Sequence, residues 1–298
     1  MSELVRPVVT AQAPQPRAVL ELLKPITWFA PMWAFGCGIA SSGEPILTRL
    51  PLVLGGVLLC GPLVCGTSQA INDWFDRHVD AINEPNRPIP SGRIPGQWGL
   101  AIALLGSVIS LIVAASLGLW VFLPACLGMA LAWAYSAPPL RLKMSGWWGP
   151  GAVGLCYETL PWFTGAAVMA GSLPDWHVVV IALLYGIGAH GIMTLNDFMA
   201  VEGDRIMGIR SLPVTMGVEH AARFACLMMA GTQAIVVTLL FVWGHLYYAL
   251  AVALLLGTQF DLMARLMRDP RGKAPWYNAT GTTLSVLGML VAAFAVRP

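Results

Sequence analysis

The chain has 298 residues, of which 57% are hydrophobic and only 11% are charged. A soluble domain carries about 25% charged residues, because it must cover its core with a solvated shell. This composition therefore excludes a soluble domain and an intrinsically disordered chain. The formal net charge of +2 is too small to indicate a nucleic-acid partner. The composition predicts a protein that is embedded in the lipid bilayer.

Nine apolar runs have about the length, roughly 20 residues, that a helix needs to cross a bilayer. In chain order, we expect them at residues 25–43, 50–72, 99–117, 118–136, 149–170, 177–196, 221–243, 245–264 and 276–296. The third and fourth runs meet at Gly118, where we expect a tight turn. The sequence therefore predicts an all-α polytopic membrane protein with nine transmembrane helices, built as a single domain over residues 1–298.

The basic residues predict the orientation, because Lys and Arg near the ends of spans stay on the cytoplasmic side. If the N-terminus is cytoplasmic, all 17 basic residues except Arg49 and Arg297 fall in cytoplasmic segments. We therefore expect residues 1–23 to form a cytoplasmic N-terminal segment. We also expect the polar loops after the second and sixth spans, which are rich in carboxylates, to lie at the cytoplasmic face.

Two similar acidic segments follow these two spans. The first reads NDWFDRHVD from Asn72 to Asp80, and the second reads NDFMAVEGD from Asn196 to Asp204. Both begin with Asn-Asp-aromatic and end with Asp at the same spacing, and each closes the second helix of a four-helix group. The sequence therefore predicts two four-helix repeats followed by one extra helix.

The spacing of the first segment indicates a metal site. Asn72, Asp76 and Asp80 recur every fourth residue and share one helix face, with Asp73 beside it. Carboxylates this close repel one another unless a cation neutralises them, and ligands that are all oxygen suit Mg²⁺. Ordinary charges at a helix end are the alternative, which the second copy of the pattern disfavours.

The second segment adds further acids. Asp197 and Asp204 are expected on one helix face, with Glu202 nearby. The predicted metal ligands are Asp73, Asp76, Asp80, Glu202 and Asp204.

Basic and polar residues near the acids are candidates for binding a diphosphate held by the metal. Arg141 and Lys143 lie in the proline-rich turn that begins at Tyr135 and fixes their direction. Topology alone is the alternative explanation for each basic residue. The predicted substrate-binding residues are Arg77, Tyr135, Arg141, Lys143, Glu158, Asp197, Arg205 and Arg210.

Residues inside the spans suggest further roles. Glu158 is an isolated carboxylate, and both contact with an acceptor substrate and a bond to a neighbouring helix stay open. His190 is expected to be a core histidine. Trp74, Phe75 and Phe198 are near enough to the acids in sequence to shield a carbocation by cation–π attraction.

These motifs resemble those of the UbiA-type superfamily of intramembrane prenyltransferases. Asn72, Asp76 and Asp80 match its first acidic motif, and Asn196 to Asp204 occupy the second. Many members carry Asp where this chain has Ala200, so the second metal site is not copied residue for residue. Within the superfamily, residues 72–94, 135–143 and 196–214 are most similar to chlorophyll and bacteriochlorophyll synthases, and residues 24–38 and 156–165 to the bacterial branch.

The resemblance implies a magnesium-dependent transferase. Asn72, Asp76, Asp80 and Asp204 would be the catalytic residues that bind Mg²⁺ and an allylic diphosphate, either geranylgeranyl or phytyl. The acceptor would be the propionate of a (bacterio)chlorophyllide. The resemblance also implies a bacterial inner membrane, cytoplasmic or intracytoplasmic, an active site that faces the cytoplasm, and protein partners from the pigment pathway.

Three alternatives stay open at this point. A prenyltransferase for a quinone precursor or for haem would use the same diphosphate site. A secondary transporter built on two repeats would use the acids to bind a coupling cation, although it would place them near the bilayer midplane. A pigment-binding assembly protein would have no need for paired acidic motifs.

Overall fold

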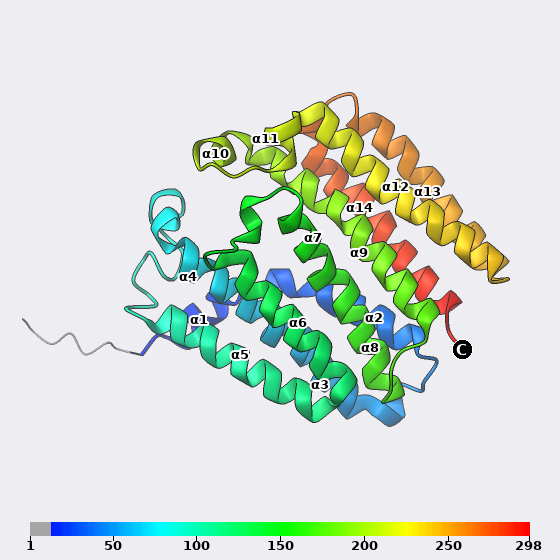
Figure 1. Cartoon of the computed structure of the whole chain (residues 1–298), viewed down its shortest axis with the longest axis horizontal. Coiled ribbons are helices and arrows are strands. Elements are labelled where there is room, and N and C mark those ends of the chain that lie inside the picture. The colour runs from blue at the N-terminus through cyan, green and yellow to red at the C-terminus, as the bar shows by residue number, and fades with distance from the viewer. Residues whose placement is uncertain (1–12) are drawn as a thin grey trace, which may run out of the picture.

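The computed structural model describes residues 13–298, and the regular elements in this range are all helices (Figure 1). Seven of them are long and apolar enough to cross a membrane. They are Leu47–Asn83, Trp98–Leu117, Leu119–Ser136, Trp176–Met199, Val218–Val242, Leu246–Leu266 and Pro270–Ala295. Each overlaps one of the nine predicted spans, so the prediction of an all-α, multi-pass membrane protein is confirmed.

The other two predicted spans are also helical, but they do not meet that length and apolarity. The first consists of the 3-10 turn η1 (Pro25–Trp28) and helix α2 (Phe29–Ser41). The fifth consists of α7 (Trp148–Gly154), the π-helical segment η5 (Leu155–Thr159) and α8 (Leu160–Ala170). The count of nine spans and the orientation of the N-terminus therefore stay predictions. Residues 1–12 of the expected cytoplasmic segment lie outside the described range, and the short helix α1 (Pro16–Leu22) follows them.

The second predicted span is one long helical run. It begins with η2 (Leu47–Arg49) and continues through α3 (Leu50–Leu58), the π-helical η3 (Leu59–Cys65) and α4 (Gly66–Asn83). Pro62 lies inside η3, where its missing N–H interrupts the regular α pattern. Because the run extends to Asn83, the first acidic segment lies on its last turns, beyond the predicted end at residue 72.

Helices α5 (Trp98–Leu117) and α6 (Leu119–Ser136) confirm the predicted tight turn. They meet at Gly118, which has a φ of 120°, a conformation that residues with a Cβ rarely adopt. The short η4 (Leu142–Met144) follows in the proline-rich turn.

The sixth predicted span, α9 (Trp176–Asn196), does not continue as a helix through the second acidic segment. The chain forms the 3-10 turn η6 (Asp197–Met199), bends at Ala200, and restarts as α10 (Val201–Ile206). The expectation that Asp197 and Asp204 share one face of a continuous helix is therefore wrong.

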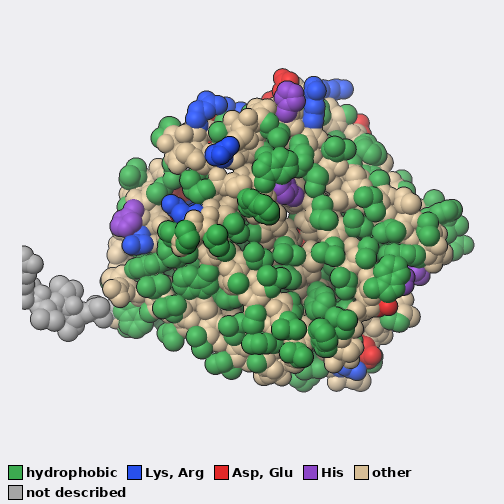
Figure 2. Space-filling model, viewed as in Figure 1, with side chains coloured by type: hydrophobic (Ala, Val, Ile, Leu, Met, Phe, Trp, Pro, Cys, Tyr) green, Lys and Arg blue, Asp and Glu red, His purple; other side chains and the backbone are tan. Residues whose placement is uncertain are grey.

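The rest of the chain consists of α11 (Leu212–Met216), α12 (Val218–Val242), α13 (Leu246–Leu266) and α14 (Pro270–Ala295). The end of α4, the loop after it, α10 and α11 all gather at one end of the molecule (Figure 1). Hydrophobic side chains cover most of the face in Figure 2, and the charged ones gather along its margins. This distribution is typical of a bundle that has a wide apolar belt in contact with lipid.

Helices α2 and α8 pack in direct backbone contact. A Cβ added at Gly38 would lie 2.0 Å from the carbonyl oxygen of Trp162, and one added at Gly165 would lie 2.2 Å from that of Phe35. Small residues commonly permit such close approach between helices in membranes. Two glycines therefore determine how the first predicted span sits against the fifth.

Candidate active site

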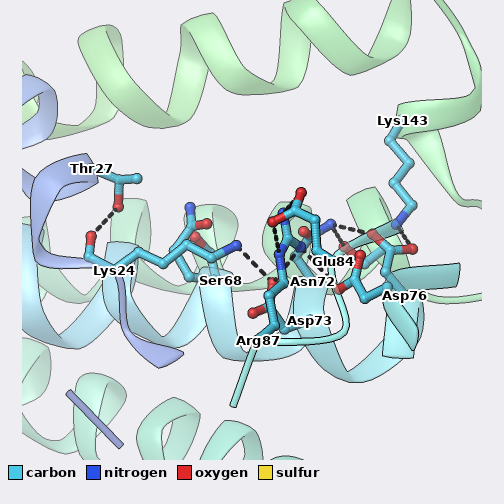
Figure 3. Close-up of polar contacts among 12 residues, drawn as sticks. Lys24, Thr27, Ser68, Asn72, Asp73, Asp76, Glu84, Arg87 and Lys143 are labelled. Carbon is cyan, nitrogen blue, oxygen red and sulfur yellow. Dashed lines mark hydrogen bonds and ion pairs between the residues drawn. The ribbon is translucent and has the colours of Figure 1, made fainter. Parts of the chain in front are cut away.

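The acids of the first segment lie on one side of α4, as their spacing predicts. The amide of Asn72 donates to Asp76 Oδ2 at 3.1 Å and also contacts Ser136 Oγ of α6 at 3.3 Å. Asp80 is 7% exposed and lies within electrostatic reach of Asp73 and Asp76. A continuous helix thus holds three carboxylates near its polar end (Figure 3).

Asp73 is the most deeply buried of these carboxylates, with 1% of its surface exposed. Its Oδ1 accepts from the Lys24 ammonium at 2.7 Å and lies 3.4 Å from the Arg87 guanidinium. Its other oxygen, Oδ2, is buried and makes no hydrogen bond with the described residues. A buried carboxylate oxygen without a donor costs free energy, so this atom is suited to accept a further ligand.

Arg87 comes from the loop that follows α4 and reaches back over the acids. Its Nη1 lies 2.9 Å from Asp80 Oδ2. Glu84 holds the same guanidinium through two hydrogen bonds of 2.6 and 2.7 Å, a fork geometry that fixes its orientation.

Asp76 is bound from the proline-rich turn. The Lys143 ammonium donates to its Oδ1, and an Arg141 nitrogen lies 3.9 Å away. Burial lowers the pKa of Lys143, and the hydrogen bond to Asp76 opposes that effect. The structure therefore brings both basic residues of the turn to the acids of α4.

The broken second segment separates its acids. Asp204 is 9% exposed and accepts from Ser211 Oγ at 2.7 Å, and it lies within electrostatic reach of Asp197. Burial raises the pKa of Asp204, while the bond from Ser211 opposes that effect. Glu202 is instead exposed and accepts two hydrogen bonds from Arg271 of α14, which hold its pKa below the ordinary value.

Tyr135 of α6 lies near acids of both segments. This tyrosine lies within electrostatic reach of Asp76 from one segment and of Asp197 and Asp204 from the other. The loops behind them are joined by backbone hydrogen bonds. Gly146 N donates to Arg210 O at 2.8 Å, and Arg210 N donates to Met144 O at 3.0 Å.

The remaining predicted residues lie apart from this cluster. Arg77 folds back onto its own helix, with its guanidinium 4.2 Å above the ring centre of Trp74. Arg205 is exposed, and it lies within electrostatic reach of Glu202. Glu158 is 8% exposed inside the bundle, and its Oε2 has no hydrogen-bond partner among the described residues.

Sequence reasoning missed three contributors to the site and gave a fourth a different role. Topology was the alternative explanation for Lys24, as for every basic residue, and Lys24 was not among the predicted substrate-binding residues. Arg87, Ser136 and Ser211 were not singled out. Arg87 follows Asp80 by seven residues. This short separation is the one local signal that could have pointed to Arg87, because a loop that turns back after a helix brings its residues near the last turns of that helix.

The donor set fits a hard cation, since the acids of α4 and Asp204 offer only oxygen ligands. The buried, partnerless Oδ2 of Asp73 supports this fit. Within residues 13–298, however, no three carboxylate, His or Cys side chains are gathered around one point. The carboxylates instead contact the cations Lys24, Arg87 and Lys143, so the five predicted ligands are not preassembled around a metal position. Glu202 points away from the other four.

Glu202 offers a direct test of the predicted ligand set. Because its carboxylate pairs with Arg271 at the surface, we expect Glu202→Ala to keep turnover within about fivefold of wild type, as removal of an exposed ion pair costs at most about 1 kcal/mol. The measurement is the magnesium dependence of turnover. A large rise in the magnesium concentration needed for half-maximal rate would show that Glu202 leaves Arg271 to bind the metal.

Lys143 is expected to bind diphosphate. A hydrogen bond to a charged group contributes about 1.5–3 kcal/mol, so Lys143→Met should lower kcat/KM for the prenyl diphosphate about 10- to 100-fold. Lys143→Arg, which keeps the charge, is the matched variant and should recover part of the loss. Equal losses in both variants would argue against an electrostatic role.

Known proteins resemble the chain in sequence and fold. The bacteriochlorophyll synthase 33 kDa chain of Cereibacter sphaeroides is 61% identical over 95% of this chain and 94% of its own length. Chlorophyll synthase of Arabidopsis thaliana is 40% identical over 93% of this chain and 73% of its own. A UbiA homologue from Archaeoglobus fulgidus, solved with GPP and Mg²⁺, has a TM-score of 0.71 at 19% identity, and the match covers 94% of this chain and 99% of that one.

The family assignment agrees with the motifs. Residues 28–295 match the UbiA prenyltransferase family. This range includes both acidic segments and the seven helices that are long and apolar enough to cross a membrane. The resemblance inferred from Asn72, Asp76 and Asp80 is confirmed. The chain belongs to the UbiA prenyltransferase family.

Proposed function

We propose that the chain transfers a prenyl group from geranylgeranyl or phytyl diphosphate to the propionate of a (bacterio)chlorophyllide and releases diphosphate. The observation that carries the donor half is the arrangement of Asp76 and Asp80 beside Lys143 and Arg87, oxygen ligands and cations that suit a metal-bound diphosphate. The acceptor is supported by the 61% identity to a bacteriochlorophyll synthase chain over nearly the whole sequence.

The metal would be held by Asp73, Asp76 and Asp80 of α4 and Asp204 of α10, with Asn72 assisting. When bound, Mg²⁺ supplies positive charge that binds the diphosphate and stabilises it as it leaves. Asn72 is already oriented by its hydrogen bonds to Asp76 and Ser136.

The cations of the site have a second use once a diphosphate binds. Lys24, Arg87 and Lys143 contact carboxylates from three separate segments. Each has hydrogens to donate to phosphate oxygens, and Arg87 presents a fork that matches two of them. These side chains would thus stabilise the negative charge that develops on the leaving group.

The acceptor needs little activation. A propionate is ionised near neutral pH and attacks through its own oxygen, so a strong general base is not required. Glu158 is the predicted contact for the acceptor. The ester is more apolar than either substrate and would leave sideways into lipid.

The proposed setting is a bacterial cytoplasmic or intracytoplasmic membrane. With α2 and the α7–α8 run counted as spans, the chain would cross it nine times as a single domain with a cytoplasmic N-terminus. The acids at the ends of α4 and α9 would then face the cytoplasm, where the polar diphosphate group of the prenyl substrate can reach them. Proteins of the pigment pathway are proposed partners.

The test uses membranes from a pigment-free host that expresses the chain. Bacteriochlorophyllide a, geranylgeranyl diphosphate and Mg²⁺ are added, and the esterified pigment is followed by chromatography. We expect ester with Mg²⁺ and a loss of at least about 100-fold with EDTA, as expected when a metal charge is removed from a reacting phosphate. An inserted, folded chain that forms no ester would contradict the acceptor assignment and favour a quinone precursor or haem.

A further inference from the structure

The aromatic residues that flank the acids in sequence are committed to other contacts. The ring of Trp74 is covered by the Arg77 guanidinium, and Phe75 packs edge-on against Trp133 at 6.1 Å between ring centres. Phe198 is 0% exposed, inside the core formed with α12 and α14. Phe198 is therefore too deeply buried to shield a carbocation, whereas Trp74 and Phe75 are half-buried and their shielding role stays a prediction.

Tyr157 is an aromatic residue from a distant segment that the structure brings to α4. It lies in the π-helical η5, and its hydroxyl accepts a hydrogen bond from Gln69 Nε2 at 3.0 Å. The Cys65 thiol donates to the same oxygen at 3.5 Å, and Cys65 in turn contacts Thr27 Oγ1 at 3.5 Å. Three segments thus fix the position of this ring.

The anchor of Tyr157 lies on the helix face that carries the acids. Gln69, Asn72 and Asp76 are spaced by three and four residues, so they follow one another along one side of α4. At 1.5 Å per residue, Gln69 lies about 10 Å from Asp76, toward the apolar part of the helix. A prenyl diphosphate with its diphosphate at Asp76 must direct its apolar chain the same way, past Asn72 toward Tyr157.

Tyr135 of α6 is a second tyrosine near this path. It is close enough to Tyr157 and to Asp76 to interact electrostatically with both. Although both tyrosines lie deep among the helices, Tyr135, Tyr157 and Gln69 all keep accessible surface that a substrate can contact. We therefore expect the first carbons of the prenyl chain to pass near both tyrosines.

We propose that Tyr157, held by Gln69, is a catalytic residue whose ring stabilises positive charge on the allylic carbon. The carbon–oxygen bond to the diphosphate breaks and its electron pair leaves with the diphosphate, while the acceptor oxygen supplies the pair for the new bond. The π face of an aromatic ring attracts a cation, most strongly where water is excluded. This role rests on the proposed function for the prenyl diphosphate donor and its place at Asp76, and not for the identity of the acceptor.

The test varies the electron density of the ring while its shape stays nearly constant. Phenylalanine and its mono-, di- and trifluorinated analogues are incorporated at position 157 of the full-length chain. Because fluorine withdraws density from the π face, we expect kcat to fall stepwise with the number of fluorines. Tyr157→Leu, which removes the ring, should lower kcat about 30-fold.

The same series at Phe163 is the control, since this residue belongs to the same helical run and packs in the core beside α3. It should leave kcat unchanged. A flat series at position 157, or equal slopes at both positions, would overturn the proposal, because a structural role responds to ring shape rather than to ring charge.

A second readout separates this proposal from that of the acceptor. Magnesium-dependent release of diphosphate from geranylgeranyl diphosphate is measured without acceptor, with water capturing the cation. If this rate follows the fluorine series while no pigment ester forms, Tyr157 keeps its role and the acceptor is wrong. If the wild-type chain releases no diphosphate either with or without the acceptor, both proposals fail.

Discussion

Replacing Asp76 or Asp80 with alanine is expected to abolish turnover, with a loss of at least about 1,000-fold, while the protein still inserts and folds. Either change removes one of the oxygen ligands that the donor set offers to Mg²⁺. It also removes a carboxylate from a neighbouring cation, which is Lys143 in one case and Arg87, still paired with Glu84, in the other. Preorganised charge at a leaving group is commonly among the largest contributions to catalysis.

Steady-state rates in isolated membranes, normalised to the amount of inserted protein, measure this effect. Asp261→Ala is the matched control, because Asp261 is an exposed carboxylate on α13 that pairs with Arg265 at 2.7 Å, and such pairs contribute little. Near-normal activity in either Asp76→Ala or Asp80→Ala would remove the metal-binding assignment from that residue.

Gly38→Ala is expected to have the largest effect on folding. The added methyl would lie 2.0 Å from the Trp162 carbonyl oxygen, which belongs to the backbone of α8 and has no side-chain freedom with which to move away. Overpacking costs about 1–3 kcal/mol in most cores, and a backbone clash lies at the upper end of that range. We expect α2 to separate from α8 and the thermal unfolding temperature in detergent to drop by several degrees.

Gly36→Ala provides the control on the same helix. A Cβ at Gly36 would meet no atom within 4 Å, and alanine favours a helix over glycine, so stability should be unchanged or slightly higher. Equal unfolding temperatures for the two variants would mean that the contact between α2 and α8 is looser than the structure shows. This pair distinguishes close packing from the general cost of replacing a glycine.

Much of the fold could be predicted because lipid imposes a simple length and polarity on each helix. The turn at Gly118 could be placed because the apolar stretch around this glycine is long enough for two membrane-spanning helices. The spacing from Asn72 to Asp80 correctly predicted one helix face, since α4 continues without a break through these residues. What spacing could not show is that the second copy bends at Ala200, so Asp197 and Asp204 do not share one face of a continuous helix.

The partners of the acids were harder to predict. Lys24 and Asp73 are 49 positions apart, and Lys143 and Asp76 are 67 apart, so local periodicity carries no information on whether they meet. The same holds for Tyr157 and Gln69, which are 88 positions apart. Sequence analysis identified the acids from their pattern, whereas the cations and the ring depend on tertiary packing.

The backbone bridge between Ser145 and Arg210 has a consequence for the order of events at the site. It joins the turn that carries Lys143 to the loop that follows Asp204, so neither can move far without the other. Occupancy of one acidic segment would then alter the energy of the other, which is the condition for positive cooperativity between two ligands. We expect prenyl diphosphate and metal, which carry opposite charges, to strengthen each other's binding.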